Sequence, residues 1–114
     1  MGQACDLTNR KCVPCQGGVV PLKGQQLYAL RSQLGEGWDL VNEHHLEKTF
    51  SFKDFKEALA FVNRVGELAE AEGHHPNINF TWGRATLTIY SHKINGLHEN
   101  DFILAAKADQ CAGA

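Results

Sequence analysis

The segment from Ile78 to Tyr90 constrains the fold most, because apolar and polar residues alternate along it on both sides of a short interruption. A period of two is typical of strands that bury one face. Gly83-Arg84 suits a two-residue type II′ turn, which predicts a hairpin in which Trp82 pairs with Ala85. The predicted core side consists of Ile78, Phe80, Trp82, Ala85, Leu87 and Ile89, and the predicted polar side consists of Asn77, Asn79, Thr81, Thr86, Thr88 and Tyr90. A slip of one residue would exchange the two sides, so this pattern requires a sheet with one covered face.

The longest predicted helix runs from Lys53 to Glu72 and can supply that cover, because its apolar residues recur at helical spacing and Gly73 follows as a terminator. Upstream, the pattern predicts a helix over 22–34, strands over 38–41 and 46–52, and a turn near 43–45. A final helix is predicted from His98 to about Ala108. Helical and strand segments in this order indicate an α+β domain.

The N-terminal residues 1–21 are predicted to be an irregular, cysteine-containing arm, and residues 22–114 to be one domain. Cys12 and Cys15 have the two-residue gap that can chelate zinc or close a redox disulfide. Zinc binding would need further ligands such as Cys5, and no second pair at matching spacing follows. Metal binding, redox activity and an incidental role therefore all stay open for these cysteines.

Composition excludes some classes of function. The formal net charge of -2 gives no basic field for a phosphate backbone, so we expect no nucleic-acid partner. No apolar run approaches the ~20 residues that span a bilayer, and the N-terminus lacks a secretory pattern. We expect a cytoplasmic protein that does not enter membranes.

Polar residues gather beside the open end of the predicted hairpin. Its register, continued outward, places His75 opposite His92, and the long helix ends nearby with Glu70 in its last turn. Several imidazoles in one place allow three interpretations: a divalent metal site, structural histidines, or acid-base catalysis. Adjacent His74 and His75 on an extended segment point to opposite faces, which disfavours joint metal ligation.

Other candidates carry less weight at this stage. Asp101 falls in the first turn of the last helix, where a role in bonding free amide groups is at least as well supported as a chemical one. Trp38 could stack on a planar ligand or lie in the core. His44-His45 lies in a predicted turn, and a surface role is favoured there.

These residues also resemble a known family. Glu70-x3-His74-His75-Pro76, with His92 and Asp101 following, is similar to the pattern of the pterin-4a-carbinolamine dehydratases, and the resemblance covers about residues 24–109. Further segments similar to the family are Gly37-Trp38, Phe50-Ser51-Phe52-Lys53-Asp54-Phe55, Ala71-Glu72-Gly73 and Ser91-His92-Lys93-Ile94-Asn95-Gly96-Leu97.

The resemblance implies a lyase that dehydrates a 4a-hydroxytetrahydropterin to quinonoid dihydropterin and water, in tetrahydrobiopterin recycling. It implies His74 and His92 as acid-base candidates and His75 as a pterin-contacting catalytic residue, with Glu70, Trp38 and Asp101 in supporting or substrate-binding roles. The pterin is the substrate, and no metal or other cofactor is implied.

The family fold implied is a two-layer, four-stranded antiparallel sheet with helices on one face, in the order helix-strand-strand-helix-strand-strand-helix. Association into homodimers or homotetramers is also implied. Because animal relatives serve as a dimerisation cofactor for a transcription factor, a non-catalytic protein-binding module of the same fold is the alternative.

Overall fold

The computed structural model describes residues 7–9 and 20–113. Its elements are α2 (Gln25–Arg31), β1 (Asp39–Val41), β2 (His45–Ser51), α3 (Phe55–Glu72), β3 (Asn77–Thr81), β4 (Arg84–Ile89), the 3-10 turn η1 (His92–Ile94) and α4 (Glu99–Gly113). The predicted order of helices and strands is confirmed, and the last helix extends beyond its predicted end.

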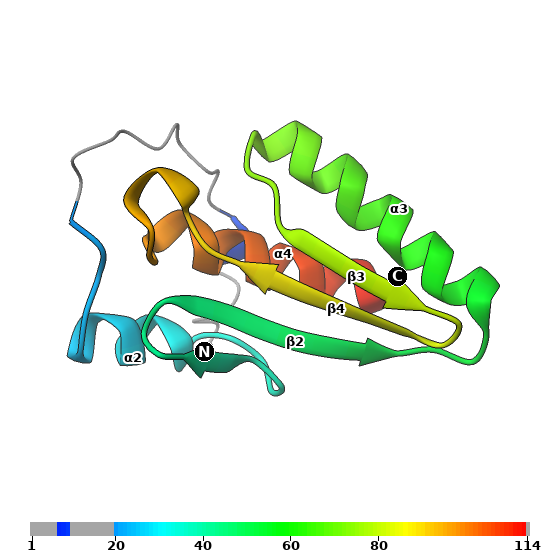
Figure 1. Cartoon of the computed structure of the whole chain (residues 1–114), viewed down its shortest axis with the longest axis horizontal. Helices are drawn as coiled ribbons and strands as arrows, with labels where there is room; N and C mark the ends of the chain where they lie inside the picture. The colour runs from blue at the N-terminus through cyan, green and yellow to red at the C-terminus, as the bar shows by residue number, and fades with distance from the viewer. Residues whose placement is uncertain (1–6, 10–19, 114) are drawn as a thin grey trace.

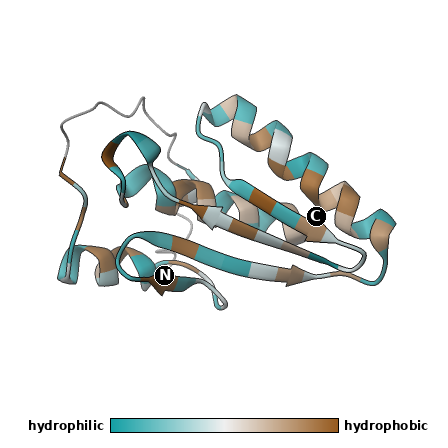
Figure 2. Cartoon of the chain, in the orientation of Figure 1, coloured by the Kyte–Doolittle hydropathy of each residue, from teal (hydrophilic) through white to brown (hydrophobic). Residues whose placement is uncertain are grey.

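The four strands form one antiparallel sheet in the order β1-β2-β4-β3. Helix α3 packs against β3 and β4, whereas α4 packs against β2 and β4 (Figure 1). Apolar and polar residues alternate along the strands (Figure 2), so the helix-facing side is buried and the opposite side is polar. Buried strand residues on the helix side include Leu46, Phe50, Ala85, Leu87 and Ile89. The predicted two-layer α+β fold is confirmed.

The register of the β3–β4 hairpin differs from the prediction by two residues. Phe80 pairs with Ala85, and the turn is Trp82-Gly83 instead of Gly83-Arg84. Gly83 has another use: its carbonyl accepts the backbone N–H of Phe52 at 2.8 Å, and a Cβ on Gly83 would lie 3.1 Å from the Phe52 carbonyl. A shift of two residues leaves the strand residues on their predicted faces, although the predicted pairing was wrong. The prediction for Trp82 was also wrong, because this residue was assigned to the core side and instead lies in the turn, 64% exposed.

Leu7 lies in the predicted arm, yet its side chain is fully buried in the core. Cys5, Cys12 and Cys15 lie outside the described residues. In the described part of the chain, none of the helices combines the length and apolar character required to cross a membrane.

Helix α3 begins and ends with well-formed caps. The Asp54 side chain accepts the backbone N–H of Glu57 at 2.9 Å, an N-cap bond. At the other end Gly73 adopts a left-handed conformation with φ 67°, and the backbone N–H of His74 donates to the Ala69 carbonyl at 3.2 Å. This Schellman-type end directs the chain from the helix into the histidine pair.

Two glycine substitutions in α3 should have opposite effects on the free energy of unfolding. Gly73→Ala should lower it by about 1 kcal/mol, because an L-residue is strained at positive φ. Gly66→Ala should raise it by about 0.5–1 kcal/mol, because Gly66 is helical and a Cβ there meets nothing within 4 Å. Urea unfolding measures both changes, and the same sign for both variants would contradict this description of the helix end.

Candidate active site

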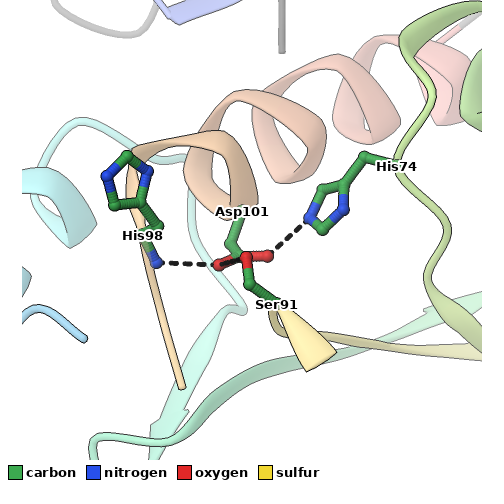
Figure 3. Close-up of polar contacts among 4 residues, drawn as sticks. All are labelled: His74, Ser91, His98 and Asp101. Atoms are coloured by element: carbon green, nitrogen blue, oxygen red, sulfur yellow. Dashed lines mark hydrogen bonds and ion pairs between the residues drawn. The ribbon is translucent and has the colours of Figure 1, made fainter. Parts of the chain in front are cut away.

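The carboxylate of Asp101 is the centre of the candidate site. Its side chain is fully buried in the first turn of α4. Oδ2 accepts the Ser91 hydroxyl at 2.9 Å and the backbone N–H of His98 at 2.8 Å, and Oδ1 lies 2.6 Å from Nε2 of His74 (Figure 3). The bond from the amide that precedes the helix is the kind predicted for Asp101 from its sequence position. The carboxylate also joins the chain after α3, the end of β4 and the start of α4.

This arrangement assigns separate roles to the two ring nitrogens of His74. A carboxylate oxygen accepts hydrogen bonds, so Nε2 carries the proton that lies between the two groups. In the neutral ring Nδ1 is then unprotonated and can accept a proton. The His74 side chain is 14% exposed, so the ring is largely enclosed and its orientation is held by Asp101. His74 therefore has the form of an oriented acid-base group.

A second imidazole–carboxylate pair lies next to it in the sequence. Nε2 of His75 is 2.6 Å from Oε2 of Glu70, which projects from the last turn of α3. The two side chains are 60% and 80% exposed, in contrast to the buried Asp101 pair. Water screens this pair, so it contributes little to stability and leaves His75 accessible to a ligand.

The predicted opposition of His75 and His92 is wrong. Strand pairing ends at Asn77 and Thr88, and the observed register continued outward would place Tyr90 opposite His75. His92 instead lies exposed on η1, directly after Ser91. The edge-to-face contact of its ring is with Tyr90, at 4.3 Å between centroids and 84° between planes. Ser91, the residue before His92 in the chain, donates its hydroxyl to Asp101.

Trp38 is a core residue, so the expectation that it borders the ligand pocket needs correction. The ring is 1% exposed, and its Nε1–H donates to Oδ2 of Asp109 at 3.0 Å. Lys48 donates to Oδ1 of the same carboxylate at 2.7 Å and lies 5.7 Å from the Trp38 ring centroid. This network ties β2 to α4 and leaves no face of the indole open for stacking.

His44 and His45 contribute more than the surface role favoured from sequence. The two Nδ1 atoms are 3.0 Å apart, and Nε2 of His44 lies 2.9 Å from Oδ1 of Asn95 in the loop after η1. The His44 ring is also 4.6 Å from the Tyr90 ring. Sequence alone did not reveal this meeting, because it depends on the pairing of β2 with β4, which is Leu46 with Ile89 at this end.

Metal-binding geometry is a separate question. Within residues 7–9 and 20–113, no group of three or more His, Cys, Asp or Glu side chains could hold a metal ion.

Cys111 is a free, half-buried thiol on α4, and burial raises its pKa while the charge of Arg64 acts in the opposite direction. A thiol of this kind is less readily ionised than an exposed one.

Comparison with known proteins agrees with this fold. The family model described as pterin 4 alpha carbinolamine dehydratase matches residues 20–111. A Rubrobacter xylanophilus protein provisionally named pterin-4-alpha-carbinolamine dehydratase is 58% identical over 105 residues, which cover 92% of this chain and 97% of that one. A protein of Alkaliphilus metalliredigens with the same provisional name is 49% identical, with 92% and 95% covered.

Solved structures of related proteins have a similar fold. A transcriptional coactivator/pterin dehydratase from Brucella melitensis aligns with a TM-score of 0.76 and 29% identity, covering 82% of this chain and 99% of that one. A pterin dehydratase-like protein described as a RuBisCO assembly factor in the alpha-carboxysome aligns with a TM-score of 0.60 and 28% identity, covering 69% and 93%. The chain belongs to the pterin-4-alpha-carbinolamine dehydratase family.

Alanine substitutions of Asp101 and Glu70 should lower the free energy of unfolding by different amounts, because the Asp101 pair is buried and the Glu70 pair is exposed. Asp101→Ala should lower the free energy of unfolding by about 3 kcal/mol, because it leaves the Ser91 hydroxyl, the His98 amide and the His74 ring without their acceptor. Glu70→Ala should lower it by less than about 1 kcal/mol, because its pair is exposed. Denaturant titration measures both. Equal losses would show that Asp101 does not organise this region.

Proposed function

We propose that this protein catalyses dehydration of a 4a-hydroxytetrahydropterin to quinonoid dihydropterin and water. Its membership of the dehydratase family supports the substrate class. The observation that carries the proposed chemistry is the pairing of His74 with the fully buried Asp101. This contact gives one imidazole a defined orientation and a defined protonated nitrogen.

The reaction needs one proton donor and one proton acceptor. The C4a–O bond breaks as the leaving hydroxyl takes a proton and departs as water, while N5 loses its proton and a C4a=N5 double bond forms. Imidazole suits both transfers because its unperturbed pKa lies near neutral pH. The net reaction consumes no proton, so the donor and acceptor can exchange roles between turnovers.

We assign His74 and His92 as the acid-base pair and His75 as the residue that contacts the pterin. His74 is enclosed and oriented by Asp101, whereas His75 is exposed and paired with Glu70, as a group that meets incoming substrate would be. His92 is exposed on η1 next to Ser91. The chemistry requires no metal or additional organic cofactor, because the pterin itself is the reactant.

The assay of this proposal follows the loss of a 4a-hydroxytetrahydropterin with purified protein. The protein should accelerate the loss, and His74→Ala should lower kcat by about 10²-fold, as expected when a positioned acid or base is removed. Changing both His75 and His92 to Ala should lower turnover at least as much. Glu67→Ala, an exposed substitution one turn before Glu70 on α3, is the matched control and should be unaffected.

Normal turnover after the loss of both His75 and His92 would exclude this assignment of the site. Normal turnover in His74→Ala would show that the Asp101 pair serves the fold alone.

A second function, that of a protein-binding module, is supported by exposed aromatic side chains. The related solved structures include a coactivator/dehydratase and an assembly factor. In this chain Trp82 is 64% exposed and Phe55 is 46% exposed, and the Phe55 ring stacks on Phe80 of the edge strand β3. Exposed aromatic side chains at a sheet edge are typical of protein contact surfaces.

We expect the purified protein to be a homodimer or homotetramer. Light scattering coupled to size-exclusion chromatography measures this, and Trp82→Ser should weaken the assembly if the aromatic edge takes part in it. Stable oligomers without any dehydratase activity would favour the protein-binding module over the enzyme. A monomer with full activity would remove the reason for assigning this edge to self-association.

A further inference from the structure

The loop that carries His92 has its backbone fixed on two sides. The Ser91 N–H donates to the Gly96 carbonyl at 2.9 Å, and these two residues form a bridge that closes the loop. The N-terminal side of the domain packs on the same point: a Cβ on Gly96 would lie 2.7 Å from Cβ of Pro21, and the Leu22 N–H donates to the Leu97 carbonyl at 2.9 Å. These contacts fix the loop ends, but they do not reach the His92 ring.

Tyr90 contacts the ring of His92. It lies two residues before His92, with its own side chain partly buried. The edge-to-face geometry at 4.3 Å and 84° is a favourable arrangement for two aromatic rings. Tyr90 therefore restricts the orientations open to an otherwise exposed imidazole.

His44 holds the far side of the loop. Its Nε2 bonds Oδ1 of Asn95, a residue in the left-handed conformation with φ 50° at the end of η1. His44 also packs on Tyr90 at 4.6 Å, so one imidazole contacts both the loop and the ring that faces His92.

The turn of the β1–β2 hairpin fixes the backbone at His44. Asn42 and Glu43 both have positive φ, and the His44 N–H donates to the Val41 carbonyl at 2.9 Å, as in the tight turns that join antiparallel strands. The Glu43 carboxylate accepts the Gly24 N–H and the Tyr28 hydroxyl, each at 3.3 Å, which ties the tip to the start of α2.

We propose that Tyr90 and His44 are positioning residues for His92: Tyr90 orients its ring, and His44 fixes its loop through Asn95. The chemical role of His92 rests on the proposed dehydratase function, whereas its placement by Tyr90 and His44 does not. Since a displacement of about 1 Å of a reacting group can cost about 10²-fold in rate, residues that never touch the substrate can affect turnover through His92.

The test combines turnover with the nuclear magnetic resonance signals of the His92 ring carbons and protons, assigned by their loss in His92→Asn. Tyr90→Leu should shift these signals, because the neighbouring aromatic ring current is removed, and should lower kcat by about tenfold with KM within about twofold. Tyr90→Phe keeps the ring and should restore both the signals and kcat. Glu67→Ala, an exposed substitution on α3, is the control and should change neither the His92 signals nor kcat.

His44 is tested in parallel, so the proposal does not depend on one variant folding. His44→Ala should shift or broaden the His92 signals and lower kcat, whereas His44→Gln retains an N–H donor for Asn95 and should recover much of the loss. Unchanged His92 signals and normal kcat in both Tyr90→Leu and His44→Ala would overturn the proposal. Shifted His92 signals in a protein without dehydratase activity would support the positioning and count against the proposed function instead.

Discussion

The buried carboxylate of Asp101 joins the parts of the chain on which the candidate site depends. One oxygen holds Ser91 and the backbone amide of His98, and the other holds the His74 ring. A buried carboxylate is costly unless its oxygens are bonded, so each of these donors stabilises the fold while it fixes the geometry of the site. The structural role of Asp101 therefore comes from these bonds, and its proposed chemical role acts through the orientation of His74.

The sheet and the helix ends bring the donors to this carboxylate. Gly73 turns the chain out of α3 so that His74 reaches the start of α4. Side chains alternate between the two faces along β4, and continuing this alternation past Ile89 directs Ser91 to the helix side. The opposite parity places Tyr90 on the open side of the sheet, where it meets His44 and His92. Ser91 thus joins the end of β4 to the buried Asp101, and the exposed imidazole of His92 follows directly on η1.

Much of this was predictable because period and capping are local properties. The limits of α3, its glycine terminator and the faces of β3 and β4 follow from residues close together in the sequence. The register was not predictable, because Gly83 is required by the approach of Phe52, a contact 31 positions away along the chain. The partners of Trp38 and His44 were not predictable for the same reason, since Asp109 and Asn95 are distant in sequence. Family resemblance supplied the proposed substrate, which no packing argument could.

The tautomer of His74 tests the central claim most directly. Long-range proton–nitrogen correlation spectra distinguish the two neutral forms of a histidine ring, provided that the pH is high enough for the ring to be neutral. If Asp101 orients His74 through Nε2, the wild-type ring is held in one neutral form, with its proton on Nε2 and Nδ1 unprotonated, and Asp101→Ala releases it to a mixture of both neutral tautomers. A wild-type His74 ring protonated on Nδ1, or a tautomer unchanged in Asp101→Ala, would contradict the account.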